Sequence, residues 1–248
     1  MHQQLPAEKR GCGMPQRDDR SHLDSFLSLF KDAKPEPLKR STYLEPEDSP
    51  FWPTRATGMR VYELMVAENL LGAAECEALS LAPDWQREET ASLVCIPSFR
   101  PEWALWVVGE RKAGFWVLLT EAEENIWYST RREQEVPRSP PVKKHRTELS
   151  TELGAAVCDI WSRVLSQTRY RQEPLLGACD GVTYHFAYSR KGMPATAGKT
   201  WSPVESTIPG KLTALAHSIK DYVRDPANQD VFMQVINDHL EWFRSHSD

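Results

Sequence analysis

The chain has 248 residues and a formal net charge of −5, from 30 basic and 35 acidic side chains. Forty per cent of its residues are hydrophobic and nine are tryptophan, which is enough for a sizeable core. The mild acidity argues against a general binder of nucleic acids or membrane surfaces. No apolar stretch could span a bilayer, and the first residues lack the apolar centre of a signal peptide. We therefore expect a cytoplasmic protein without membrane contact.

Cysteine and motif content point away from cofactors. The cysteines are widely spaced, form no CxxC pair and are odd in number: Cys12, Cys76, Cys95, Cys158 and Cys179. This usage predicts reduced thiols and no metal site. Gly-rich phosphate loops, the GxSxG elbow and the HExxH motif are all absent from the sequence. The sequence therefore predicts neither a cofactor nor a standard catalytic motif.

Residues 1–58 differ in composition from the rest and contain seven of the eighteen prolines. We expect a flexible Pro-rich arm here, with a short helix near 21–33. Four apolar side chains recur on one face of that helix, and they are candidate binding residues: Leu23, Phe26, Leu27 and Phe30. The helix is expected to dock either on its own domain or on a partner. Residues 59–248 are expected to form a single domain.

Within that domain, residues 59–81 predict one helix or two short ones, with a strand over 60–67 as the alternative. Runs rich in Val, Ile, Trp, Phe and Tyr then predict strands over 91–97, 103–109, 113–119 and 125–129. The second and third of these are expected to form a hairpin around Glu110-Arg111-Lys112. Residues 131–146 carry three prolines and six basic side chains, which predicts a loop.

The second half of the chain alternates between helical and strand patterns. Apolar stripes predict helices over 148–167, 211–224 and 228–244. Asp180-Gly181 predicts a tight hairpin turn, and the next strand points Val182, Tyr184, Phe186 and Tyr188 inward. Trp201-Ser202-Pro203 ends the strand region, after which Ser206 or Thr207 can cap a helix whose first turn contains Pro209. This order favours an α+β fold, a mainly antiparallel sheet packed against helices, with the Pro-rich N-terminal arm attached.

Three short motifs carry a resemblance to a known group. They are Leu93–Pro101 (LVCIPSFRP), the DGxxYxF strand at Asp180–Phe186, and the WSP sequence at 201–203 before a helix. Together with an amphipathic helix containing Trp161, they resemble a broad group of uncharacterised bacterial proteins. The resemblance covers roughly residues 90–224. It implies no reaction and no catalytic residues, because the group has none assigned.

Two residues of the 180–199 segment are candidate binding residues, Asp180 and His185. The alternative for Asp180 is a purely structural role in the turn, and the alternative for His185 is a position on an exposed strand face. On an enzymatic interpretation, Asp180, His185 and Lys199 would form a dispersed polar site facing Glu121 or Glu123. On one helix face, His217 and Asp221 lie four residues apart, which suits acid–base work, a metal, or an ordinary surface ion pair.

These observations lead to one main hypothesis and two alternatives. The main one is a non-enzymatic protein-binding module, with an immunity or adaptor role for a toxin-like partner as one concrete form. The second is an enzyme with the dispersed polar site. The third is a weak nucleic-acid binder acting through the basic residues of 131–146.

Overall fold

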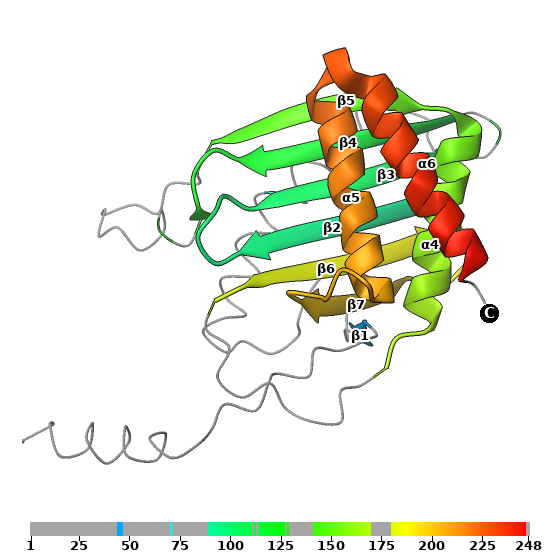
Figure 1. Ribbon diagram of the computed structural model, residues 1–248, viewed down its shortest axis with the longest axis horizontal. Coiled ribbons are helices and arrows are strands. Elements are labelled where there is room, and N and C mark those ends of the chain that lie inside the picture. The colour runs from blue at the N-terminus through cyan, green and yellow to red at the C-terminus, as the bar shows by residue number, and fades with distance from the viewer. Residues whose placement is uncertain are drawn as a thin grey trace, which may run out of the picture. The chain divides into compact units, whose positions relative to one another are not determined.

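The computed structural model describes residues 44–46, 70, 89–110, 112, 114–126, 128, 141–169 and 180–246, all within the compact unit Arg40–Asp248. They form a seven-stranded antiparallel sheet in the order β1-β7-β6-β2-β3-β4-β5, with helices over one face (Figure 1). The strands are β1 (Glu45–Pro46), β2 (Glu89–Pro97), β3 (Trp103–Glu110), β4 (Gly114–Ala122), β5 (Val142–Leu149), β6 (Val182–Arg190) and β7 (Thr196–Trp201). The helices are α4 (Thr151–Ser166), α5 (Ile208–Arg224), the 3-10 turn η1 (Pro226–Asn228) and α6 (Gln229–Ser245). The predicted α+β class is confirmed.

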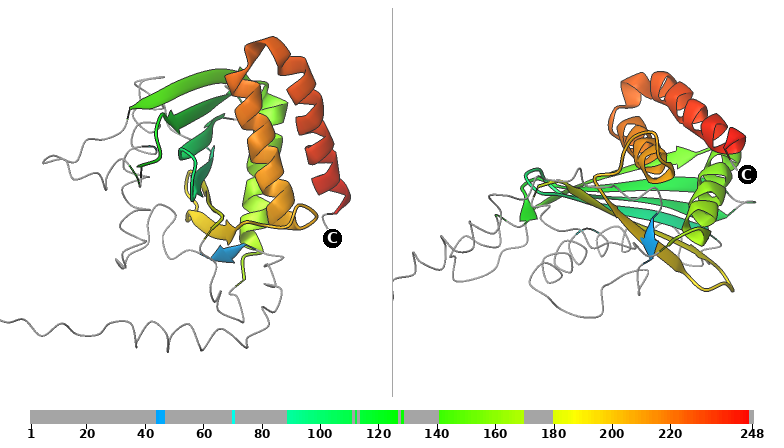
Figure 2. Two further views of the ribbon diagram at one scale, coloured as in Figure 1. Left: turned by 60° about the vertical axis from the view of Figure 1, so that its left-hand side comes forward. Right: turned by 60° about the horizontal axis from the view of Figure 1, so that its bottom comes forward.

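The helices build two layers on the same side of the sheet. Helices α4 and α5 pack on the sheet, and α6 lies on the outer side of α5 (Figure 2). Alternate side chains of the central strands point into this layer, among them Leu93, Leu105 and Phe186. Trp161 of α4 packs edge-on against Phe186, with ring centroids 5.8 Å apart, and its indole N–H donates to the Ser92 carbonyl. Burial of these aromatic side chains stabilises the sheet–helix contact.

Most of the expected strands and helices are present. Strands β2, β3 and β4 contain the ranges 91–97, 103–109 and most of 113–119, and β3 and β4 pair as the expected hairpin. Tyr184, Phe186 and Tyr188 are buried in β6, whereas Thr183 and His185 are half-buried, so the expected alternation is confirmed. Helix α5 begins after its N-cap Thr207, whose hydroxyl accepts from the Gly210 amide, and Pro209 stands in its first turn.

The prediction of a loop over 131–146 was wrong at its C-terminal end. Residues 142–149 form β5, which pairs with β4 at the edge of the sheet. At an edge, one side of the strand is open to solvent, so the exposed side chains of Lys143, Lys144 and Arg146 are tolerated there. The helix expected from 148 accordingly begins only at Thr151, after Ser150 caps it by accepting from the Leu153 amide.

The prediction of a strand over 125–129 was also wrong. Ile126 and Tyr128 are helical. The side chain of Asn125 accepts from the Tyr128 amide at 3.2 Å and so caps a helical turn. The Ile126 amide donates to the buried carboxylate of Glu102 at 2.8 Å. These side-chain hydrogen bonds outweigh the strand propensity of the sequence NIWYS.

The tight turn expected at Asp180-Gly181 lies elsewhere. The β6–β7 hairpin turns at residues 191–193, where Gly192 has a φ of 80° and the Met193 amide donates to the Arg190 carbonyl. Gly181 instead lies in close packing just before β6, because a Cβ there would lie 2.5 Å from the Trp201 ring. Glycine at this position therefore provides close approach of the backbone, not a positive φ.

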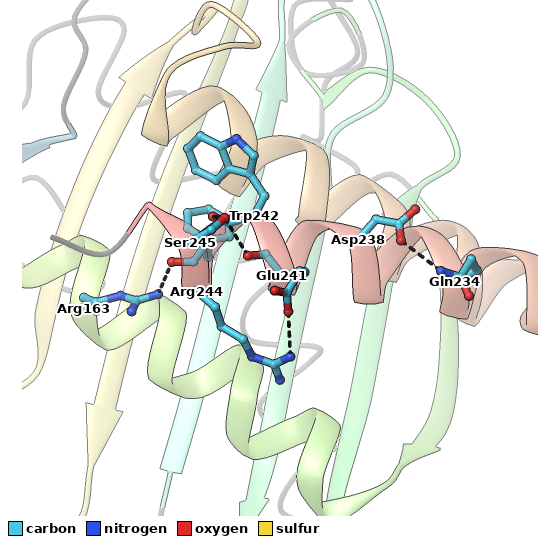
Figure 3. A network of polar contacts seen from close by, with 8 residues as sticks. Arg163, Gln234, Asp238, Glu241, Trp242, Arg244 and Ser245 are labelled. Carbon is cyan, nitrogen blue, oxygen red and sulfur yellow. Dashed lines mark hydrogen bonds and ion pairs between the residues drawn. The ribbon is translucent and has the colours of Figure 1, made fainter.

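Polar contacts cover the outer face of α6 (Figure 3). Gln234 donates to Asp238 at 2.9 Å, Arg244 pairs with Glu241 at 3.3 Å, and Ser245 donates to backbone carbonyls of the preceding turn. Arg163 of α4 donates to the Phe243 carbonyl at 3.2 Å, which ties α4 to the end of α6. The polar groups named here are thus satisfied locally, and α6 also exposes Val231 and Val235.

Two parts of the N-terminal region contact the sheet, one by pairing with a strand and one by packing on a face. Strand β1 lies inside the range 1–58 and pairs with β7, and the carbonyl of the buried Leu44 accepts from the Arg169 amide. From the range 59–81 the structure describes only Leu70, which is helical and buried against Val94 and Ala104 on the other sheet face. The helix expected at 21–33 lies outside the described residues. No helix in the described ranges is long and apolar enough to cross a membrane.

Candidate functional site

A cleft of about 550 Å³ opens between α5 and the end of the sheet at which β2 and β4 finish. Its floor comes from side chains that face the helices on neighbouring strands: Cys95, Trp103, Glu121 and Tyr184. These four lie in one cross-strand row, because Cys95 pairs with both Trp103 and Tyr184, and Trp103 pairs with Glu121. Helix α5 adds His217, Lys220, Asp221 and Arg224 as the opposite wall.

An aromatic pair and a histidine meet at the floor of the cleft. The Tyr184 hydroxyl lies 3.2 Å from Nε2 of His217. The His217 ring also meets Trp103 edge-on, with centroids 5.0 Å apart. The imidazole is therefore held between β3 and β6 and has a fixed orientation over the sheet.

Glu121 is the centre of an ion-pair cluster beside that histidine. Its carboxylate lies 2.9 Å from Lys220 Nζ, 3.9 Å from Arg224 Nε and 3.6 Å from His145 Nε2. Glu121 and Lys220 are only 15% and 13% exposed, and the Lys220 ammonium also lies 4.5 Å from the centre of the Trp103 ring. This cluster ties α5 to β4 and β5, and it neutralises the buried charges of both partners.

Burial controls the protonation of the floor. It raises the pKa of the Cys95 thiol to about 12, against the lowering effect of nearby Lys220 and of hydrogen bonds from Tyr184 and Trp103. Burial, with Cys95 beside it, also raises the pKa of Tyr184. The pKa of His217 is lowered by burial and further by Lys220, and Asp221 opposes this. Near pH 7 the floor therefore presents a neutral thiol, a neutral phenol and a neutral imidazole.

The rim of the cleft includes the loop between β2 and β3. Ser98 fixes this loop, because its hydroxyl both donates to the Gly181 carbonyl and accepts from the Gly181 amide, at 2.9 and 3.0 Å. Asn125 fixes the next part by donating to the Arg100 carbonyl at 2.8 Å. Phe99, between these two anchors, is 65% exposed. The fold thus holds an aromatic side chain in solvent on a braced loop.

The residues proposed from sequence lie mostly outside this cleft. Asp180 is exposed before β6, and His185 is half-buried on the sheet face away from α5. His185 does lie directly opposite Lys199, but Glu121 faces the helix side, so the expected site of His185 and Lys199 facing Glu121 is not assembled. The remaining candidates, Leu23, Phe26, Leu27 and Phe30, lie outside the described residues.

Of the residues considered from sequence, Glu121, Glu123, His217 and Asp221 do line the cleft. His217 is half-buried against Trp103 and Tyr184, which the interpretation as a surface ion pair did not anticipate. Cys95, Trp103 and Lys220 were missed as site residues, since each by itself matches a core strand or a helix surface, whereas Tyr184 was expected to face inward on its strand. Only the pairing of β2 with β3 and β6 places Cys95, Trp103 and Tyr184 in one row, and Lys220 adds to the cleft from α5.

In the described part of the chain, no group of three or more His, Cys, Asp or Glu side chains could hold a metal ion. No protein-family model, no curated protein and no solved structure matches the chain.

Proposed function

We propose that this protein is a non-enzymatic protein-binding module whose contact surface is the Ser98–Pro101 loop together with the cleft beside it. The observation that carries the proposal is Phe99, 65% exposed between two hydrogen-bonded anchors. Exposed aromatic side chains on rigid loops are typical anchors of protein interfaces. Because the loop is already ordered, binding through Phe99 costs little further conformational entropy.

The chemistry of the cleft floor supports binding over catalysis. A nucleophilic cysteine needs a lowered pKa, whereas that of Cys95 is raised to about 12. Glu121 is engaged by Lys220 at 2.9 Å, which occupies the carboxylate that would otherwise serve as a general base. The floor is thus a set of mutually satisfied groups suited to recognition. An immunity or adaptor role for a toxin-like partner is one form that such a module takes.

A capture experiment with two matched variants tests the proposal. The full-length chain, Phe99→Ala and Met193→Ala are each used to capture proteins from the cells that naturally make the chain. Met193 is 61% exposed on the β6–β7 turn and serves as a control of similar exposure. We expect a stoichiometric partner that is lost with Phe99→Ala and kept with Met193→Ala. Equal capture by all three chains would refute the role of the loop.

The convergence of Tyr184, His217 and Lys220 favours an enzyme as the second candidate. A neutral imidazole hydrogen-bonded to a phenol at 3.2 Å can accept a proton from a substrate in a cleft of this size. Incubation with a metabolite extract, followed by mass spectrometry, tests this function. Consumption of a compound by the natural chain but not by His217→Gln would support it, and unchanged extracts would count against it.

A further inference from the structure

We infer that the cleft, with a second hollow beside it, binds an extended acidic segment of the partner protein. The inference rests on the proposed function and adds the chemistry of the bound segment. It is carried by the shape of the two hollows, by the different exposure of the charged groups in the first, and by the loop between β2 and β3, whose Arg100 and Pro101 line the first hollow.

The shape comes from two adjoining hollows. The cleft of about 550 Å³ and a second hollow of about 300 Å³ share Val182, Tyr184 and His217 as their common wall. The second hollow continues between β6, the residues after β7, and the first turns of α5. Two hollows that share three lining residues suit a chain that runs over both and places a side chain in each.

The charge comes from the walls of the first hollow. Four basic side chains from three parts of the fold line it: Arg100, Lys143, Lys220 and Arg224. Lys220 is 13% exposed and is paired with Glu121, which is 15% exposed. The other two acidic residues of the lining are Glu123, 40% exposed, and the half-buried Asp221. By comparison, Arg224 is 59% and Lys143 65% exposed, and Arg100 is also exposed. The most exposed charged groups of the cleft are therefore the cationic ends of these three side chains, and such groups bind carboxylates.

The second hollow has a different character. Its lining includes Val182, Pro203, Thr213 and Ala214, and its charged residue is Glu205. This hollow suits a small apolar side chain and disfavours a second carboxylate. The expected segment therefore carries Asp or Glu near Arg100 and Arg224 and a small apolar residue next to them, with Phe99 in contact at the rim.

A peptide fits these walls better than a nucleic acid does. The phosphates of a nucleic acid are closely and regularly spaced, and Glu121, Glu123 and Asp221 stand among the basic residues of the cleft. A peptide can place single carboxylates at the exposed cations and place uncharged residues beside the acidic side chains. The net charge of −5 adds a repulsion that grows with the number of phosphates.

A random-peptide selection tests the inference. Twelve-residue peptides displayed on phage are selected on the full-length chain, on Arg100→Gln/Arg224→Gln and on Lys112→Gln. Lys112 is exposed in the turn between β3 and β4 and is the matched control. The best peptide is then made with a fluorescent label, along with a copy in which Asp and Glu are replaced by Asn and Gln. Affinities are measured by anisotropy at low and high salt.

We expect peptides enriched in Asp and Glu, with an affinity that falls as salt rises. Loss of one exposed charge pair weakens binding by up to about fivefold, so the double variant should weaken it by up to about 25-fold. Lys112→Gln should change it less than twofold, roughly the noise of such measurements. Thermal melting confirms that the variants fold. Arg100→Gln alone keeps the Arg224–Glu121 contact, so it tests the loss of a basic charge without disturbing that ion pair.

The inference is overturned if no peptide is selected, if the amide copy binds equally, or if Lys112→Gln matches the double variant. Tighter binding of a labelled DNA 20-mer that is lost in the double variant would assign the cleft to nucleic acid and overturn it too. The proposed function fails separately. A partner lost with Phe99→Ala but kept with Arg100→Gln/Arg224→Gln leaves the function standing and rejects the acidic segment.

Discussion

Ser98 and Gly181, 83 residues apart in the chain, are joined by three hydrogen bonds. The Ser98 amide and hydroxyl both donate to the Gly181 carbonyl at 2.9 Å, and the Gly181 amide donates back to the hydroxyl at 3.0 Å. This contact fixes the end of β2 to the start of β6 and leaves Phe99 exposed. It connects the stability of the sheet with the geometry of the proposed binding loop.

Ser98→Ala removes the two side-chain hydrogen bonds and keeps the backbone one. We expect the free energy of unfolding to fall by about 1–2 kcal/mol in a urea titration. Partner capture should fall as well, because the loop loses its brace. Ser166→Ala is the control, since Ser166 is exposed and its hydroxyl donates only to Arg163 within its own helix. A Ser98→Ala chain as stable as Ser166→Ala would show that the contact contributes little.

Glu121→Gln and Glu123→Gln form a matched pair on adjacent parts of the cleft. Glu121→Gln leaves the largely buried Lys220 ammonium without its counter-charge, and unfolding should become easier by about 1–3 kcal/mol. Glu123 pairs with Lys143 at the surface, with 40% and 65% of the side chains exposed. Its replacement should cost less than about 1 kcal/mol. Urea titrations at pH 7 measure both, and equal losses would contradict the central role of Glu121.

The lowered pKa of His217 predicts a stability that depends on pH. In the unfolded chain a histidine takes up its proton near pH 6.5, whereas His217 in the folded protein does so only at lower pH. The unfolded state therefore binds more protons as pH falls through 6.5, and folding becomes less favourable. The pKa of His239 is lowered by burial too, so it acts in the same direction. Urea titrations at pH 7.5 and 5.5 should show a smaller loss for His217→Gln than for the natural chain. An identical loss would mean that His217 is protonated freely in the fold.

The raised pKa of Cys95 predicts that its thiol reacts slowly with alkylating reagents. Iodoacetamide reacts with thiolates, and at pH 8 a thiol with a pKa of about 12 is almost entirely protonated. We expect Cys95 in the native protein to be alkylated far more slowly than in urea, as followed by mass spectrometry of its peptide. Cys158, which is also buried, provides an internal comparison. Rapid native labelling of Cys95 alone would point to an activated thiolate and favour the enzymatic alternative.

Local patterns were sufficient to predict much of the fold. Aromatic and β-branched runs gave β2, β3 and β4, and the stripe of Leu212, Leu215 and Ile219 identified the buried face of α5. Strand β5 could not be predicted in this way. Its sequence VKKHRTEL has the charge of a loop, and only its position beside β4 at the sheet edge makes that charge compatible with a strand.

The candidate site was far less predictable, because it is assembled by pairing between distant strands. Tyr184 was expected to be buried, and it is, but nothing in its neighbourhood in the sequence indicates Cys95 or Trp103 as neighbours. The alternation of β6 did place Tyr184 and His185 on opposite faces. To identify Tyr184 and not His185 as the site residue, one would have needed to know which face of the sheet α5 covers.

The position of β2 has a consequence for how the chain is made. All nine of its residues are buried, and it pairs with β6. Gly181, just before β6, is 83 residues from Ser98, just after β2. At a synthesis rate of about 5–20 residues per second, β2 leaves the ribosome several seconds before its second neighbour exists. During that interval one side of an apolar strand offers its backbone groups to any other strand. We therefore expect chains cut short before residue 182 to aggregate instead of folding.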